Sequence, residues 1–265
     1  MNINLILTNF AQQELVISRN DIERDRIKTS IDRLKKNLKN NLGDLISDFI
    51  TFGSYTRNTI LPRMYDLNSD IDIMVICNTK NGTKTPETYR KNLLNVLQQT
   101  YPNSISRKDF PAVKLELNHI KFDIVPAYRE DYVFMLGRYY YIPDSLSNWR
   151  TTIPNDLNET LGNKNQSFGN NIIRNTIRLC KHWNASSGYP FESYLMEEEI
   201  LRLGFWGTED LYSCFLYTLK NIAGNFAGVN QALEYINQYK GNFFNAPNEA
   251  GQLRWLQKLL PGLKL

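Results

Sequence analysis

The chain has 265 residues, of which 42% are hydrophobic and 12% are aromatic. This length and composition allow a sizeable buried core, so they exclude a disordered chain and predict one large domain or two closely packed lobes. The formal net charge of +4 is mild and does not by itself require a nucleic-acid partner.

The chain has three scattered cysteines and two histidines. Cys77, Cys180 and Cys214 lie in apolar segments, which predicts reduced core thiols rather than disulfides. His119 and His182 lie near no cysteine pair at zinc-ligand spacing, which argues against a zinc site. The N-terminal apolar run is too short for a secretion signal, and no run of about 18 apolar residues occurs that could span a membrane. We therefore expect a soluble, cytoplasmic protein with no membrane partner.

The first half of the chain predicts a mixture of helices and strands. Apolar residues at helical spacing through residues 10–42 predict one or two helices that end near Gly43. We interpret the basic run at residues 33–36 as a solvated helix face, and a nucleic-acid face is the alternative. The remaining elements expected in this half are strands at 46–52, 70–77, 111–117, 120–126 and 132–141 and a helix at 86–99.

The second half of the chain is helical throughout. Neither a low-complexity linker nor an internal repeat separates the halves. We therefore expect an α+β protein with two lobes that share a cleft. Residues 1–154 should form a mixed sheet with flanking helices and an N-terminal spine helix, and residues 155–265 a helical lobe that closes the cleft. The helices expected in this lobe are 156–161, 168–186, 191–203, 208–225, 229–239 and 249–260.

The motif with the most chemical content is a Gly-Ser turn followed by two spaced aspartates. Gly53 and Ser54 follow an apolar strand, where glycine lets the backbone approach a phosphate and serine adds a hydroxyl donor. Asp70 and Asp72 alternate with isoleucines, and the strand period of two sends both carboxylates to one face. Because neighbouring carboxylates repel each other, a cation is expected between them, and their hard oxygen ligands suit Mg²⁺.

A third carboxylate supports this interpretation. Asp123 is the only acid in the apolar run 121–126. The alternative is an ordinary strand in which Asp123 pairs with Lys121. Three acids on two strands, downstream of a Gly-Ser turn, favour a catalytic site in which Asp70, Asp72 and Asp123 hold two Mg²⁺ ions. Mn²⁺ is expected to substitute for Mg²⁺.

Together with their flanking residues, these motifs resemble a known family. The Gly53-Ser54 turn, the pair Asp70 and Asp72 and the distant Asp123 resemble the nucleotidyltransferase signature of the DNA polymerase beta superfamily. The longer form, residues 53–63 and 69–72, resembles the CD-NTases, bacterial relatives of cyclic GMP-AMP synthase, and a second block at 177–184 and 191–197 agrees with it. The resemblance implies a polymerase-beta-like nucleotidyltransferase palm in the first lobe.

The resemblance also implies nucleotide-binding residues. In that family a lysine on one helix and a serine that opens the next helix bind the triphosphate, which implies Lys181 and Ser193. A surface lysine and a helix-capping serine are the alternatives. Tyr194 is placed to stack on a nucleobase, and a core tyrosine is the alternative. Asn148, in the segment 142–152 that should bridge the lobes, is the candidate for hydrogen bonding to a base edge.

The resemblance implies Mg²⁺-dependent synthesis of a cyclic di- or oligonucleotide second messenger from NTPs, in anti-phage signalling. A downstream effector would read the product, and the enzyme is expected to be a monomer without an obligatory nucleic-acid partner. One alternative is a template-independent transferase that adds nucleotides to RNA, for which the mild charge supplies no obvious basic track. Another is a catalytically silent nucleotide-binding protein, which has little use for three desolvated carboxylates.

Overall fold

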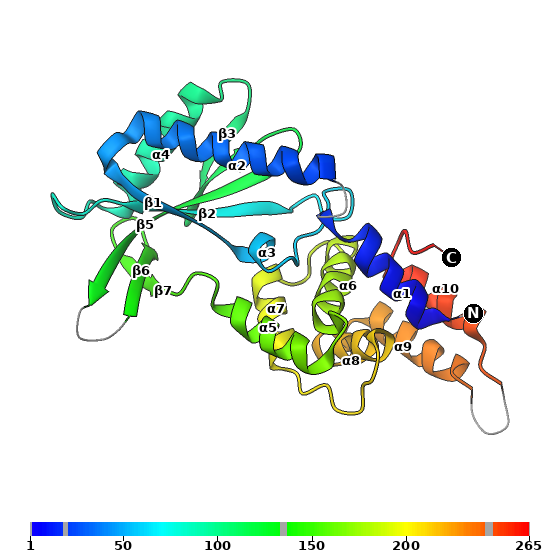
Figure 1. Ribbon diagram of the computed structural model, residues 1–265. Coiled ribbons are helices and arrows are strands. Elements are labelled where there is room, and N and C mark those ends of the chain that lie inside the picture. The colour runs from blue at the N-terminus through cyan, green and yellow to red at the C-terminus, as the bar shows by residue number, and fades with distance from the viewer. Residues whose placement is uncertain (1, 18–20, 133–136, 242–245, 265) are drawn as a thin grey trace. The chain divides into compact units, whose positions relative to one another are not determined.

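The computed structural model describes residues 2–17, 21–132, 137–241 and 246–264 (Figure 1). The chain divides into two compact units. The α+β class expected from the sequence is confirmed, with a sheet in one unit and helices in the other. The sheet unit comprises residues 18–57 and 68–156, and the helical unit comprises residues 1–17, 58–67 and 157–265.

The sheet unit is built on a mixed, seven-stranded sheet. Strands β1, β2, β5, β4 and β3 follow one another in that order, β6 pairs with β5, and β7 pairs with β6. β2 and β5 are parallel, whereas the other pairs are antiparallel. The elements are α2 (Asp21–Leu42), β1 (Ile46–Phe52), α3 (Gly53–Thr56), β2 (Asp70–Cys77), α4 (Pro86–Thr100), β3 (Ile105–Asp109), β4 (Ala112–Glu116), β5 (Lys121–Tyr132), β6 (Gly137–Pro143) and β7 (Trp149–Thr152).

Helices α2 and α4 pack together on one side of this sheet (Figure 1). Val75 and Cys77 of β2 line a small cavity with Tyr89 of α4, so the odd-numbered residues of β2 face the helices. Successive side chains of a strand point to opposite faces. Asp70 and Asp72 therefore lie on the face of the sheet that is turned away from α2 and α4.

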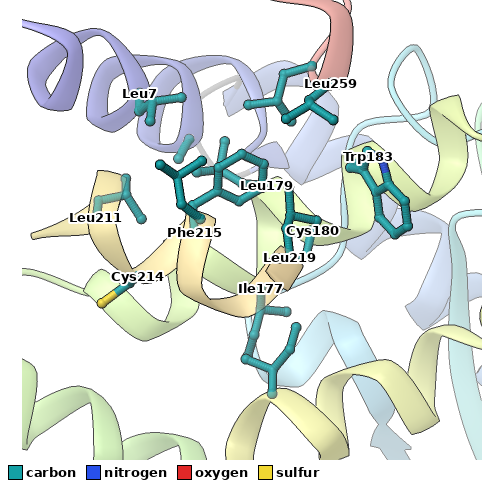
Figure 2. Packing of buried hydrophobic residues seen from close by; sticks show 14 of the residues in the cluster. Leu7, Ile177, Leu179, Cys180, Trp183, Leu211, Cys214, Phe215, Leu219 and Leu259 are labelled. Carbon is teal, nitrogen blue, oxygen red and sulfur yellow. The ribbon is translucent and has the colours of Figure 1, made fainter. Parts of the chain in front are cut away.

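The helical unit has a core between α6 and α8, whose apolar residues recur at helical spacing. Figure 2 shows Leu179 of α6 and Phe215 and Leu219 of α8 in this core, together with Leu7 of α1. The elements are α1 (Ile3–Asn9), a π-helical turn η1 (Phe10–Glu14), α5 (Asp156–Phe168), α6 (Ile172–Ser186), α7 (Ser193–Arg202), α8 (Leu211–Ala223), α9 (Ala227–Tyr239) and α10 (Glu249–Leu259).

Two segments from the first half of the sequence belong to the helical unit. Leu7 and Leu15 are buried in its core. The Arg178 guanidinium donates through Nε and Nη2 to the carbonyl oxygen of Asn58, at 3.0 and 2.6 Å. This division differs from the expected single boundary after residue 154. The N-terminal residues and the segment around Asn58 pack against helices that are distant in sequence. Local periodicity carries no signal for such packing.

The sequence does not predict β3 or β7. Both are short and polar and lie at edges of the strand order, where apolar alternation is not needed. The strand expected at 132–141 is replaced by the end of β5 and by β6, and residues 133–136 lie outside the described residues. Among the helices of the described ranges, none combines the length and the apolar character that a membrane span requires.

Candidate active site

The three predicted acids share one face of two neighbouring strands. Asp72 of β2 and Asp123 of β5 are direct partners in the parallel register, and Asp70 lies two residues before Asp72. Residues in register across a sheet point to the same face, as do residues two apart on one strand. The structure therefore brings Asp70, Asp72 and Asp123 together on the face that α2 and α4 leave uncovered.

Gly53 packs directly against the row of these three acids, Asp70, Asp72 and Asp123, which we call the acidic row. Its φ of +74° is in the left-handed region, and a Cβ at this position would lie 1.9 Å from Oδ2 of Asp72. Only glycine can place its backbone this close to the carboxylate. Gly53 opens the single-turn helix α3, in which Thr56 Oγ1 donates to the Gly53 carbonyl oxygen at 2.9 Å. Ser54 is the next residue, so the Gly-Ser turn and the acids meet as the sequence predicts.

The carboxylate of Asp123 is only partly satisfied. Its side chain is 20% exposed, and Oδ2 lies 3.6 Å from Nζ of Lys114. Within the described residues, Oδ1 is buried and has no hydrogen-bond partner. Burial raises the pKa of the Asp123 carboxyl above its ordinary value, and the Lys114 ammonium opposes that rise. A buried carboxylate oxygen without a donor is costly, so a further cation is expected here.

The donor set suits a hard divalent cation, which prefers carboxylate oxygens. In the part of the chain that the structure describes, however, no group of three or more Asp, Glu, His or Cys side chains is arranged to hold a metal ion. Asp123 is instead paired with Lys114. The residue types, the shared face and the unsatisfied oxygen of Asp123 fit Mg²⁺, and the metal site itself stays a prediction.

Sequence reasoning did not identify Lys114. The lysine considered as a partner of Asp123 was Lys121, which is the register partner of Asp70. The alternation of Val113, Lys114 and Leu115 is the sequence signal that indicates it, because Val113 and Leu115 are buried on either side of Lys114. That alternation places Lys114 on the opposite face of β4 from these two residues.

Lys181 lies inside the helical unit rather than on its surface. Its Nζ donates to Oε1 of Glu197 at 3.1 Å, and the two side chains are 6% and 1% exposed. The Thr59 hydroxyl lies 3.0 and 3.1 Å from the two carboxylate oxygens of Glu197. The surface-lysine alternative is therefore wrong. The ammonium is already neutralised by a buried carboxylate, which supports a role in joining α6 to α7.

Ser193 and Tyr194 open helix α7. The N-cap residue is Glu192, and no side-chain hydrogen bond caps this helix in the described structure. Ser193 is thus the first helical residue and not the cap considered from the sequence. Tyr194 is 41% exposed, so the core-tyrosine alternative is wrong and its ring is accessible.

The structure does not bring Asn148 to the acids. Asn148 lies in the turn between β6 and β7, where its N–H donates to Ser145 Oγ at 2.9 Å and its carbonyl oxygen accepts from the Asp144 N–H at 2.9 Å. The Leu146 carbonyl oxygen accepts from the Glu87 N–H at the start of α4. This turn is anchored to α4, on the other side of the sheet from the acids, and hydrogen bonding of Asn148 to a base edge stays a prediction.

Comparisons with known proteins agree with this site. The family model for the Second Messenger Oligonucleotide or Dinucleotide Synthetase (SMODS) domain matches residues 1–165. A probable cyclic nucleotide synthase of Bacillus cereus strain VD146 is 29% identical, in a match that covers 69% of this chain and 67% of the relative.

Solved structures share the fold. E. coli MS115-1 CdnC, solved with ATP, matches with a TM-score of 0.69 and 14% identity over 98% of each chain. The Vibrio cholerae DncV cyclic AMP-GMP synthase, solved with the linear intermediate 5′ pppA(3′,5′)pG, matches with a TM-score of 0.59 and 12% identity. That match covers 81% of this chain and 68% of DncV.

Proposed function

We propose that this chain, which belongs to the Second Messenger Oligonucleotide or Dinucleotide Synthetase domain family, makes a cyclic di- or oligonucleotide from NTPs. The observation that carries the proposal is the fit of Gly53 against Asp72, in register with Asp123. The fit supports the proposal because a glycine turn of this kind can bind phosphate, and Asp70, Asp72 and Asp123 share the face of the sheet beside it. The name of the Bacillus cereus relative and the linear intermediate in DncV support the same reaction class.

In the proposed mechanism, Asp70, Asp72 and Asp123 would hold two Mg²⁺ ions, with Mn²⁺ as a substitute. When bound, such ions lower the pKa of an attacking ribose hydroxyl and neutralise charge on the departing pyrophosphate. Backbone N–H groups at Gly53 and the hydroxyl of Ser54 would bind phosphate oxygens, because the absence of a Cβ at Gly53 lets the backbone approach closely. No protein side chain acts as a nucleophile.

The same carboxylates would serve two successive transfers. In-line attack of a ribose hydroxyl on an α-phosphate gives a linear product and pyrophosphate. After repositioning of that product, a second attack closes the ring and releases a second pyrophosphate. Asp72 and Asp123 hold fixed places in the sheet register, so both steps meet the same preorganised charges.

For the helical unit we propose a supporting role in nucleotide binding. The N-cap residue Glu192 makes no side-chain capping hydrogen bond, and N–H groups at the start of this helix, near Ser193, would donate to phosphate oxygens. The exposed ring of Tyr194 can stack on a base. Lys181 reaches α7 through its ion pair with Glu197, so its proposed effect on the triphosphate is to fix the start of α7.

The signalling context is also part of the proposal. The resemblance to CD-NTases favours an anti-phage system in which a downstream effector reads the cyclic product. We place the reaction in the cytoplasm, where NTP substrates are available, and no nucleic-acid partner is required for the chemistry.

Product analysis tests this function. Purified protein is incubated with each pair of labelled NTPs and with Mg²⁺ or Mn²⁺, and the mixture is treated with phosphatase and examined by mass spectrometry. We expect a phosphatase-resistant cyclic product from wild type and none from Asp72→Asn, which keeps the shape of the side chain but loses its charge. Extension of an added RNA in place of a cyclic product would favour the RNA-adding transferase. An unchanged product from Asp72→Asn would contradict the assigned site.

A further inference from the structure

Lys114 continues the acidic row onto a third strand. In the antiparallel pairing of β4 and β5, Lys114 is the direct partner of Asp123, which is itself the partner of Asp72. Direct partners in a sheet share a face. Asp72, Asp123 and Lys114 therefore form one row across β2, β5 and β4.

The Lys114 ammonium interacts with two carboxylates, at different distances. Its Nζ lies 2.9 Å from Oδ2 of Asp109, which is hydrogen-bond distance, and 3.6 Å from Oδ2 of Asp123. The Asp109 side chain is 49% exposed and that of Asp123 is 20% exposed. Lys114 is thus held by a hydrogen bond to the more exposed Asp109, and its positive charge also attracts the more buried Asp123.

In the described residues, Lys114 supplies the one ion pair of Asp123. The nearby cations Arg107 and Lys121 have other register partners, which are Lys114 and Asp70 respectively. Arg107 is also ion-paired with Glu116. A divalent cation at Asp123 would meet the Lys114 ammonium at close range, and like charges this close repel strongly.

From this geometry we infer that Lys114 is a positioning residue of the proposed active site. It helps to neutralise Asp123 when no metal is bound, and it gives up this contact but keeps its hydrogen bond to Asp109 when a divalent cation binds. The inference rests on the proposed function. One consequence is that the Lys114 ammonium reduces the repulsion between the carboxylates of this row when no metal is bound. A second is that a metal ion must compete with this ammonium for Asp123.

Two substitutions have opposite predicted effects on Mn²⁺ binding by nucleotide-free protein, measured by electron paramagnetic resonance of free Mn²⁺. Lys114→Met removes the competing charge and should tighten binding roughly five- to tenfold. It should also lower the melting temperature in EDTA by about 2–4 °C. Asp109→Asn removes the alternative anchor, which leaves Asp123 as the charged partner of Lys114 and should weaken binding several-fold.

Controls separate this effect from a general change in charge. Lys114→Arg should bind Mn²⁺ like wild type, because it keeps the charge. Lys108→Met should also leave binding unchanged, because the Lys108 ammonium pairs with Glu87 of α4 and its register partner is Val113, on the other face. In the Lys114→Met background, Asp109→Asn should lose most of its effect, because Asp109 acts through the lysine.

Unchanged or weaker Mn²⁺ binding by folded Lys114→Met, or an equal effect of Asp109→Asn with and without Lys114, would overturn the inference. The failure of the proposed function gives a different result. In that case wild type would form no phosphatase-resistant product, while the Lys114 and Asp109 variants would still change Mn²⁺ binding as predicted.

Discussion

Lys114 in the sheet unit and Lys181 in the helical unit both pair with carboxylates, but their surroundings differ. Lys181 and Glu197 are almost fully buried, and Thr59 lies within hydrogen-bond distance of both oxygens of Glu197. Lys114 is 26% exposed and stands between two acids, and one oxygen of Asp123 accepts no hydrogen bond in the described structure. The buried network of Lys181, Glu197 and Thr59 is closed, because its charges are paired within the protein, and it stabilises one arrangement. The site at Lys114 and Asp123 is open, because a carboxylate oxygen there can still bind a ligand.

We expect the largest loss of activity from a substitution at the open site. Gly53→Ala should lower turnover on the order of a hundredfold or more, because its Cβ would collide with Asp72 and displace a carboxylate that stabilises the transition state. Initial rates at saturating NTP and Mg²⁺ measure this change.

A second glycine provides the matched control for Gly53→Ala. Gly43 also has a positive φ, of +52°, but a Cβ there would meet nothing within 4 Å. Gly43→Ala should therefore cost about 1–2 kcal/mol of stability from backbone strain and leave turnover near that of wild type. Equal turnover of the two variants would show that contact with Asp72 is not what position 53 requires.

The closed network predicts a stability effect. Lys181→Met leaves Glu197 buried without its cation, so we expect a loss of about 3–5 kcal/mol in the free energy of unfolding. Denaturant unfolding measures this loss. At a temperature where the variant is folded, the apparent KM for NTP should rise only modestly, because Lys181 affects the triphosphate through the position of α7 and does not contact it.

The double variant Lys181→Met with Glu197→Gln separates a structural from a ligand-binding lysine. It removes both charges and should recover part of the lost stability. A greatly raised KM for folded Lys181→Met, with an unchanged melting temperature, would instead assign Lys181 to direct phosphate binding.

A smaller effect is expected from His182 in the same helical core. Its Nε2 lies 2.8 Å from the carbonyl oxygen of Pro261, and burial lowers the pKa of His182 below its ordinary value. The unfolded chain, with a histidine pKa of about 6.5, takes up the proton first as the pH falls. Stability should therefore be fully present above about pH 6.5 and decline from there as the pH falls toward the folded-state pKa.

Unfolding midpoints of wild type and His182→Asn between pH 7.5 and 5 measure this dependence. The decline should be shallower in the variant, and smaller than the loss caused by Lys181→Met. Parallel pH profiles would remove His182 as its source.

Much of the sheet site is predictable because strand alternation is local. The spacing of Asp70, Asp72 and Asp123 indicates a shared face, and the same reasoning applied to β4 would have identified Lys114. The pairing of Lys181 with Glu197 depends on how two helices pack, which residue spacing does not determine. The position of the turn that holds Asn148 is not predictable from spacing for a similar reason, because this turn is anchored by a backbone hydrogen bond between Leu146 and the distant Glu87.

The most direct test of the central claim compares wild type with Asp123→Asn in two measurements on the same protein, Mn²⁺ binding and formation of a phosphatase-resistant product. Asp123 supplies the unsatisfied oxygen of the acidic row, so the variant should stay folded and lose both metal binding and product. Retention of both by folded Asp123→Asn would contradict the assignment of this row as a metal-dependent catalytic centre.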